Sequence, residues 1–236
     1  MHREALTHQQ KRWRRRVFAI TWLAYAGFYL CRKNFAVVMP LLAEDLGYSK
    51  MDFATVIFSY SLLYALGQFG NGLLSDRFGA RLVVGVGLTL SILSNLFMGI
   101  AVSLALFTVL ACVNGVGQSS GWPGLVKTMA HWFGRRERGV VMGWWGTNYV
   151  LGGSFATVFA TFWVVHPWLF LDWGWRRGFW LPAWLLAIVT LLFVRLVRNR
   201  PHCRQVGTKS DPCVGAIGIV AFTNLLDHAR AKFLVA

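Results

Sequence analysis

The sequence contains few acidic residues and lacks the motifs of the common enzyme classes. Only 9 Asp and Glu residues stand against 24 Lys and Arg, which gives a net charge of +15. No glycine-rich phosphate loop followed by Lys-Ser or Lys-Thr occurs, nor does His-Glu-x-x-His or Gly-x-Ser-x-Gly. The sequence therefore predicts a protein that is not an enzyme and has no catalytic residues.

Cysteine is also scarce, and its spacing fits no metal site. The four cysteines, Cys31, Cys112, Cys203 and Cys213, show neither C-x-x-C nor C-x-x-H spacing. Cys31 and Cys112 fall within apolar stretches, where we expect them to serve packing. We therefore predict no metal ion, no cofactor and no disulfide framework.

Charged residues are absent from two long stretches, residues 53–75 and 82–126. The whole chain is 56% hydrophobic and holds 12 Trp and 18 Phe. A soluble chain of 236 residues could not bury such runs in one core. The sequence therefore predicts an integral membrane protein, whose first expected partner is the lipid bilayer.

A transmembrane helix needs about 20 apolar residues, and on this scale the chain holds a series of spans. We place six of them, at residues 17–42, 50–75, 81–101, 104–130, 139–165 and 177–198. The uncharged run 82–126 is about twice the crossing length, so it must form two helices with a turn near 101–104. The predicted fold is an all-α integral membrane bundle over residues 17–201, preceded by a basic segment at 1–16.

Basic residues gather at the span ends that share one face of this arrangement. They are Lys11, Arg12, Arg14, Arg15, Arg16, Arg77, Arg81, Arg135, Arg136, Arg138, Arg195, Arg198 and Arg200. Lys50, Arg176 and Arg177 are exceptions on the opposite face. Because cytoplasmic loops are rich in Lys and Arg, we expect both termini in the cytoplasm and the protein in the inner or plasma membrane. Charge that follows span ends does not indicate nucleic acid as a partner.

The charged motif Gly72-Leu-Leu-Ser-Asp76-Arg77-Phe-Gly79-Ala-Arg81 separates the second and third spans. It resembles the signature loop between the second and third helices of the major facilitator superfamily. The resemblance implies that the six helices form one half of that fold, with a 3+3 inverted repeat. Arg77 and Arg81 can pair with Asp76 or with helix ends, and pairs made in only one conformer would bias alternating access.

Arg32 and Lys33 are predicted to lie deep in the first span. From Val17 to Arg32 is about 22 Å of helix at 1.5 Å per residue. A bare cation at that depth costs at least about 2.5–3.5 kcal/mol, so it needs a polar cavity or an anionic partner. No acidic residue lies within the spans except near their ends. Either an anionic ligand supplies the counter-charge, or helix carbonyls and water stabilise the cation in its place.

The stretch Tyr29–Pro40, which reads Tyr-Leu-Cys-Arg-Lys-Asn-Phe-Ala-Val-Val-Met-Pro, resembles the first helix of the organophosphate:phosphate antiporter family. The resemblance implies that Arg32 binds the phosphoryl group of the substrate. Tyr25 and Tyr29 lie one turn apart, so they either face the same cavity as Arg32 or pack as aromatic residues.

Residues 114–153 carry a Gly-Trp-Pro and an Arg-Gly…Trp…Gly-Gly pattern that also resembles this family. Tyr149 stands where the family's signature has a substrate-linked His, and Gln68 where glycerol-phosphate members have a basic residue. Both can hydrogen-bond phosphate oxygens, with less Coulombic help. Lys127 either joins this set or extends its ammonium to the membrane surface. Glycines within 115–124 are expected to allow close helix packing.

These resemblances imply a secondary active transporter that exchanges organophosphate or sugar-phosphate anions for inorganic phosphate. The chain would be its N-terminal half, completed by a missing C-terminal six-helix half or by a second copy. Two alternatives stay open: a sugar-phosphate sensor that binds without transporting, and a nonfunctional gene fragment. Residues 202–236 depart from the apolar pattern and are either a cytoplasmic tail or linker, or out-of-frame or truncated sequence.

Overall fold

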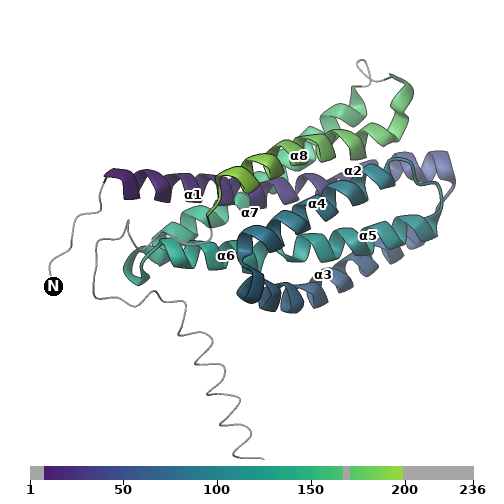
Figure 1. Cartoon of the computed structure of the whole chain (residues 1–236). Coiled ribbons are helices and arrows are strands. Elements are labelled where there is room, and N and C mark those ends of the chain that lie inside the picture. The colour runs from purple at the N-terminus through teal and green to yellow at the C-terminus, as the bar shows by residue number, and fades with distance from the viewer. Residues whose placement is uncertain (1–7, 167–170, 199–236) are drawn as a thin grey trace, which may run out of the picture. The chain divides into compact units, whose positions relative to one another are not determined.

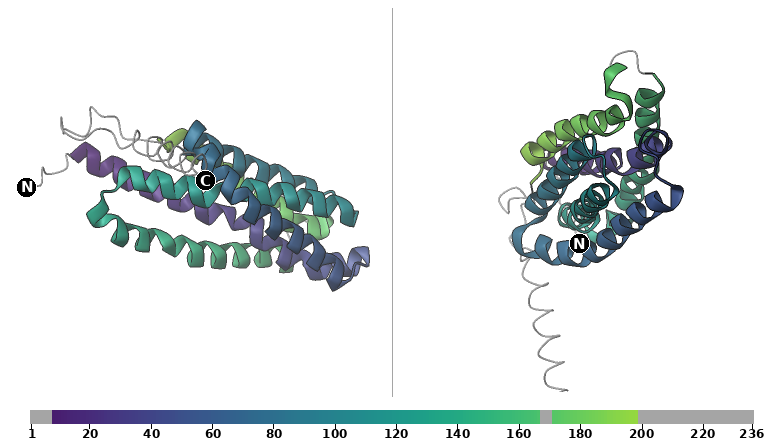
Figure 2. Two further views of the ribbon diagram at one scale, coloured as in Figure 1. Left: turned by 90° about the horizontal axis from the view of Figure 1, so that it is seen from below. Right: turned by 90° about the vertical axis from the view of Figure 1, so that its right-hand side faces the viewer.

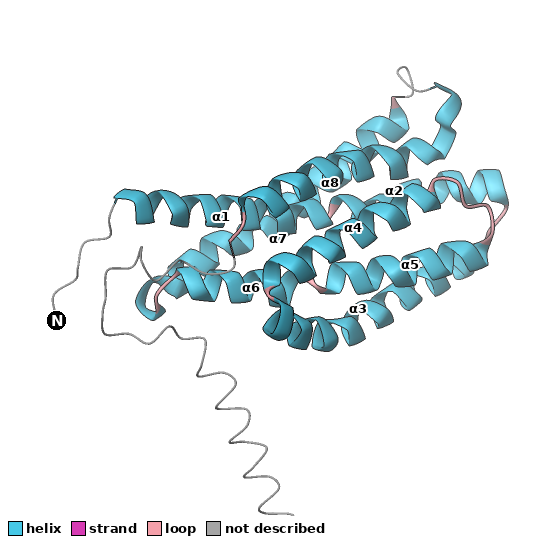
Figure 3. Cartoon of the chain, in the orientation of Figure 1, coloured by secondary structure: helices cyan, strands magenta, loops and turns pink. Residues whose placement is uncertain are grey.

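The helices of the bundle run roughly along one common direction (Figures 1 and 2). The computed structural model describes residues 8–166 and 171–198, and within these ranges it holds helices and no strand (Figure 3). In chain order the elements are α1 (His8–Phe28), α2 (Leu30–Leu46), α3 (Lys50–Phe78), α4 (Ala80–Met98), α5 (Leu104–Ser119), α6 (Gly121–Trp132), α7 (Arg135–Val165), the 3-10 helix η2 (Leu171–Arg176) and α8 (Arg177–Leu196). The predicted all-α class is confirmed. The predictions for residues 202–236 lie outside the described residues.

The described helices correspond in outline to the six predicted spans. Those long and apolar enough to cross a membrane are Lys50–Phe78, Ala80–Met98, Leu104–Trp132, Arg135–Val165 and Trp173–Leu196. The first span, predicted at 17–42, is divided between α1 and α2, and α1 already begins at His8 and includes the basic residues before the span. The turn predicted near 101–104 is confirmed, because α4 ends at Met98 and α5 begins at Leu104.

Two of the spans are broken at a single residue, Tyr29 between α1 and α2 and Ser120 between α5 and α6. At both breaks the backbone N–H donates three residues back instead of four: Tyr29 to the carbonyl of Ala26 at 3.1 Å, and Ser120 to that of Gly117 at 3.3 Å. Pro123 follows the second break and has no N–H to donate. Each of these spans is therefore interrupted for a single residue and continues as a second helix.

The loop predicted at residues 72–81 is wrong in its boundaries, because most of it is helical. Helix α3 continues to Phe78 and α4 begins at Ala80, so Asp76 and Arg77 lie in the last turn of a helix. Only Gly79 stands between the two helices, with φ of 86°. Glycine adopts this left-handed conformation without steric cost, which lets the chain reverse within one residue.

Tryptophan N–H groups fasten neighbouring helices to one another. The indole nitrogens donate from Trp22 to Thr147 Oγ1 (3.0 Å), Trp132 to the Arg198 carbonyl (3.1 Å), Trp145 to Thr21 Oγ1 (3.2 Å), Trp175 to Asp45 Oδ2 (2.7 Å) and Trp180 to the Leu96 carbonyl (3.0 Å). A buried tryptophan combines a large apolar surface with one donor that must be satisfied. The frequency of Trp in this chain thus has a structural reason in helix attachment.

Arg177, an exception to the predicted charge distribution, has a structural position. Its side chain is buried, and its Nη2 donates to the Val164 carbonyl at 3.0 Å, near the C-terminal end of α7. The carbonyls at a helix C-terminus carry partial negative charge and attract cations. Arg177 therefore joins the start of α8 to the end of α7. This structural role explains its presence on the face where few basic residues are expected.

Glycines allow the backbones of neighbouring helices to touch, which confirms the packing interpretation. A Cβ on Gly117 would lie 2.7 Å from the carbonyl oxygen of Gly87, and one on Gly87 would lie 2.3 Å from that of Gly117. Helices α4 and α5 thus meet backbone to backbone. A Cβ on Gly115 would come within 2.6 Å of the Tyr60 carbonyl oxygen, which gives α5 a second close approach, to α3.

We predict that Gly117→Ala destabilises the bundle, because its new methyl group meets backbone that cannot yield. Overpacking of this kind costs about 1–3 kcal/mol. Gly146→Ala is the matched control, since a Cβ at Gly146 has nothing within 4 Å. Thermal unfolding in detergent would measure both variants. Equal melting temperatures for the two would show that the close approach of α4 and α5 is not needed.

Candidate functional site

Arg32 lies in α2, one turn after the break at Tyr29, and is held by neutral groups. Its Nε donates to Gln118 Oε1 at 2.8 Å. Its guanidinium carbon lies 5.0 Å from the centre of the Tyr29 ring and 4.7 Å from that of the Tyr64 ring. Cation–π attraction to two rings partly replaces the hydration that the cation loses on burial. Among the described residues the recorded ion pairs are Arg14–Glu137 and Lys127–Asp76, so Arg32 has no carboxylate partner there.

Gln118 connects Arg32 to a wider polar network inside the bundle. Its Oε1 also accepts from the Tyr60 hydroxyl at 3.0 Å, and its Nε2 donates to the Cys31 carbonyl at 3.0 Å and to Asn114 Oδ1 at 3.1 Å. Asn114 Nδ2 donates to the same Cys31 carbonyl at 2.8 Å. Both amides are buried, so α5 fixes the backbone and the side chain of α2 at the position of the arginine.

Aromatic rings surround the other side of Arg32. Tyr29 contacts Tyr25, with ring centres 5.9 Å apart, and Tyr149, at 5.7 Å. Tyr25 in turn contacts Trp122 at 5.7 Å and Trp145 at 5.4 Å. These ring contacts agree with the packing alternative for Tyr25 and Tyr29, and neither residue lines the cavity of about 210 Å³ that adjoins Arg32.

One hydroxyl in this group is left without a partner. The Tyr29 hydroxyl is buried and makes no hydrogen bond, and the fully buried amide of Asn148, which precedes Tyr149, makes none on either atom. A buried polar group without a partner costs about 1–3 kcal/mol. The Tyr29 hydroxyl is therefore a buried polar group next to Arg32 that no hydrogen bond in the described part of the chain satisfies.

A cavity of about 210 Å³ adjoins Arg32 between α2, α3, α4 and α5. Its polar lining includes Arg32, Lys33, Tyr60 and Ser61. The remaining wall is largely apolar: Phe35, Ala36, Val56, Ile57, Met98 and Ala111. Lys33, which follows Arg32 in α2, lines the same cavity, so two basic residues border one space.

The structure brings together some of the predicted site residues and separates others. Arg32, Tyr29 and Tyr149 form one contiguous group. Gln68 is half-buried in α3, one turn beyond Tyr64. Lys127 lies elsewhere, in α6, where its Nζ pairs with Asp76 and donates to the Ser75 carbonyl at 2.9 Å.

Lys127 is therefore part of the charged motif at 72–81. It is the basic partner that the structure gives Asp76, whereas Arg77 and Arg81 were predicted to pair either with Asp76 or with helix ends. Arg81 donates to the Val194 carbonyl near the end of α8, as the second alternative predicted, and the guanidinium carbon of Arg77 lies 5.4 Å from the Phe78 ring centre. The motif thus links α3 to α6 and α4 to α8.

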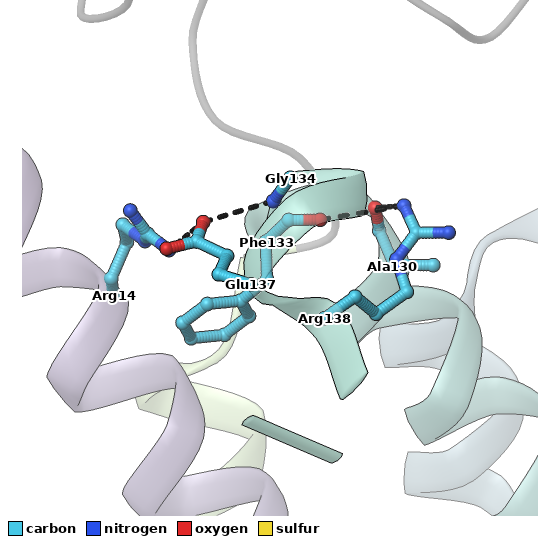
Figure 4. Close-up of polar contacts among 6 residues, drawn as sticks. All are labelled: Arg14, Ala130, Phe133, Gly134, Glu137 and Arg138. Atoms are coloured by element: carbon cyan, nitrogen blue, oxygen red, sulfur yellow. Dashed lines mark hydrogen bonds and ion pairs between the residues drawn. The ribbon is translucent and has the colours of Figure 1, made fainter. Parts of the chain in front are cut away.

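A second charged cluster ties the connection between α6 and α7 to α1 (Figure 4). Glu137 accepts from the backbone N–H of Gly134 at 3.0 Å and pairs with Arg14 of α1. Arg138 Nη2 donates to the carbonyls of Ala130, at 2.8 Å, and Phe133, at 3.3 Å, at the end of α6. Glu137 thus attaches the connection to α1, and Arg138 attaches it to the C-terminal end of α6.

Four residues of the Arg32 network were not predicted: Asn114, Gln118, Tyr60 and Tyr64. A signal for them exists in the sequence. Asn114 and Gln118 are four residues apart in an otherwise apolar span, and so are Tyr60 and Tyr64, so each pair lies on one helix face. Polar residues within a span mark functional positions by default.

Comparison with known proteins defines the class to which this fold and site belong. Residues 21–233 match the profile described as Major Facilitator Superfamily. Two solved structures share the fold: a bacterial homolog of the human lysosomal transporter Spinster (TM-score 0.69, 19% identity, 85% of this chain and 45% of that one) and the proton:xylose symporter XylE (TM-score 0.69, 14% identity, 89% and 50%). The chain belongs to the major facilitator superfamily.

The curated relatives narrow this placement. The chain is 36% identical over 196 residues to a glycerol-3-phosphate transporter of Bacillus subtilis, covering 81% of this chain and 43% of the relative. It is 29% identical over 199 residues to a probable hexose phosphate transport protein of Chlamydia trachomatis (84% and 42%) and 29% over 190 residues to the membrane sensor protein UhpC of Escherichia coli (80% and 42%). The chain thus spans less than half the length of these relatives and corresponds to their N-terminal half.

We predict that Gln118→Leu destabilises the bundle, because it removes the acceptor of Arg32 and leaves buried polar groups unpaired. The expected loss is about 1–3 kcal/mol of unfolding free energy. Gln68→Leu is the matched control, since the structure gives Gln68 no hydrogen bond among the described residues. Denaturant unfolding in detergent would measure both, and an unchanged Gln118→Leu protein would contradict a structural role for the network.

Proposed function

We propose that this chain forms the N-terminal half of a secondary carrier that exchanges organophosphate or sugar-phosphate anions for inorganic phosphate. Arg32 binds the phosphoryl group. The observation that carries the proposal is that Arg32 sits within the bundle, oriented by an amide and two aromatic rings, with no carboxylate against it among the described residues. The positive charge of Arg32 therefore has no counter-charge in the site, and an anionic substrate supplies one.

The chemistry of the neighbours favours a phosphate ester. A guanidinium binds phosphate oxygens through parallel N–H···O bonds, which a carboxylate or phosphate matches and a neutral sugar does not. Tyr29 adds a buried hydroxyl without a partner, and Tyr149, 62% exposed, presents a second hydroxyl from α7. The phosphate-ester names of the relatives agree with this chemistry.

We propose a phosphate ester as the substrate and do not assign one particular ester. Tyr149 and Gln68 occupy positions at which a cation would hold the anion more tightly, and both are neutral. These two residues therefore attract the substrate anion less strongly than cations would. Arg32 makes the main electrostatic contribution, and Lys33 lines the same cavity. Exchange against phosphate places one anion in the site for another and runs down the combined gradients of the two anions without ATP.

The carrier requires a complementary six-helix half, because carriers of this superfamily bind substrate between two halves near the bilayer midplane. Large apolar side chains are exposed along α3 and α7, including Phe58, Phe69, Trp144 and Phe155. Lipid and a complementary half together would cover these faces. The complement is a C-terminal six-helix half or a second copy of this chain. The basic end of the bundle would face the cytoplasm.

The binding prediction concerns Arg32→Ala in the purified chain. Labelled phosphate and labelled hexose or glycerol phosphates would be titrated into wild type and variant. Loss of a charge-assisted contact is expected to weaken binding about 10- to 100-fold. Arg136→Ala is the control, since Arg136 is exposed at the start of α7. Equal loss in both variants, or no saturable binding to wild type, would reject an anion site in this half.

The transport prediction concerns Asp76→Asn, which removes the ion pair with Lys127. If that pair stabilises one conformer, the exchange rate changes while substrate affinity does not. In vesicles that hold this chain with its complement, we expect exchange to slow about two- to fivefold, the range for an exposed ion pair. Glu44→Gln, an exposed acid at the other end, is the control. Equal loss of binding and exchange would contradict this role, and binding without flux would favour a sensor.

A further inference from the structure

Two arginines from distant parts of the chain meet at one tryptophan at the end of the bundle where α1 begins. The guanidinium carbon of Arg16 lies 5.0 Å from the Trp13 ring centre, and that of Arg198, two residues past the end of α8, lies 4.5 Å from it. Both arginine side chains are exposed. The first and last described helices thus present two cations on a single indole.

The backbone beneath these arginines is anchored. The indole nitrogen of Trp132, which is 8% exposed, donates to the Arg198 carbonyl at 3.1 Å, and Val197 is 1% exposed. On the α1 side, Val17 follows Arg16 and is fully buried. The two guanidiniums are therefore carried by fixed backbone, although their charged ends face outward.

These cations have no anionic partner in the described part of the chain. The acid that contacts α1 in an ion pair, Glu137, is paired with Arg14. The exposed residues Lys11, Arg12 and Arg15 add further positive charge on the same helix. Two cations near one ring repel each other, and an anion bound near both would offset that repulsion.

We propose that Trp13, Arg16 and Arg198 form a binding site for the phosphodiester of an anionic phospholipid. The arginines hold the phosphate, for which the planar guanidinium is suited. The indole lies at the level of the headgroups, where tryptophan is enriched in membrane proteins. Basic clusters beside a membrane helix attract anionic lipid in this way.

This site is separate from the one that holds Arg32. Sixteen residues of helix separate Arg16 from Arg32, which corresponds to about 24 Å at 1.5 Å per residue. A lipid at the first site would join the start of α1 to the end of α8. Because α1 also carries the Arg14 contact to the α6–α7 connection, lipid binding would stabilise this whole end of the bundle.

The experiment counts phosphatidylglycerol molecules retained by the purified full chain, using native mass spectrometry from a neutral detergent. Phosphatidylcholine is the zwitterionic control, and soluble glycerol phosphate is the competitor that separates a lipid site from a site for free phosphate. The test variant is Arg16→Gln with Arg198→Gln. The matched control is Arg12→Gln with Arg15→Gln, which removes the same charge from exposed positions at the same end.

Wild type is expected to prefer phosphatidylglycerol to phosphatidylcholine, and the test variant to lose about 30-fold in affinity for the anionic lipid, as two cations near the surface would give. The control variant keeps most of its affinity. Trp13→Ala, which leaves every charge in place, is expected to weaken retention as well. Equal losses of lipid affinity in the test and control variants would show that retention depends only on the total positive charge at this end, and would overturn the proposal. So would displacement by glycerol phosphate, or equal retention of the two lipids.

Discussion

The interior of the bundle depends on one partly buried contact, the hydrogen bond from Arg32 to Gln118. An arginine within a membrane bundle is costly unless polar groups receive it, and here the receiving amide also binds the backbone of the same helix through the Cys31 carbonyl. The network therefore does two things at once. It attaches α5 to α2, and it orients a cation without neutralising it, which is the property on which the proposed anion site rests.

The helix arrangement could be predicted from the sequence because it rests on simple quantities. The length of the uncharged run 82–126 predicted two helices and their turn, and the structure places that turn between Met98 and Leu104. The break at Ser120 has a sequence signal in Gly121 and Pro123, which follow it, whereas the break at Tyr29 could not be predicted in the same way. Tyr29 has no local signal of its own, since neither Gly nor Pro stands beside it. The boundary at Gly79 was missed because a charged motif was assumed to be a loop.

The site was predicted in part. Arg32 could be found because it is a cation without a counter-charge in apolar sequence. Gln118 could not be assigned from that argument, because a neutral amide carries no charge imbalance and its partner lies 86 residues away. Lys127 was grouped with the substrate residues from its position in a motif, whereas a sequence cannot show that its ammonium reaches Asp76. Pairings between distant helices are determined by packing and not by spacing.

The contact between Gly87 and Gly117 has a mechanical consequence. Where two backbones touch without intervening side chains, there are no rotamers to change and no layer that could slide. Helices α4 and α5 are therefore expected to move as a pair, and a Cβ on Gly115 would meet the Tyr60 carbonyl oxygen, so α5 also lies close against α3. Motion in this half is then expected to occur as rotation of a rigid block, with bending confined to the breaks at Tyr29 and Ser120.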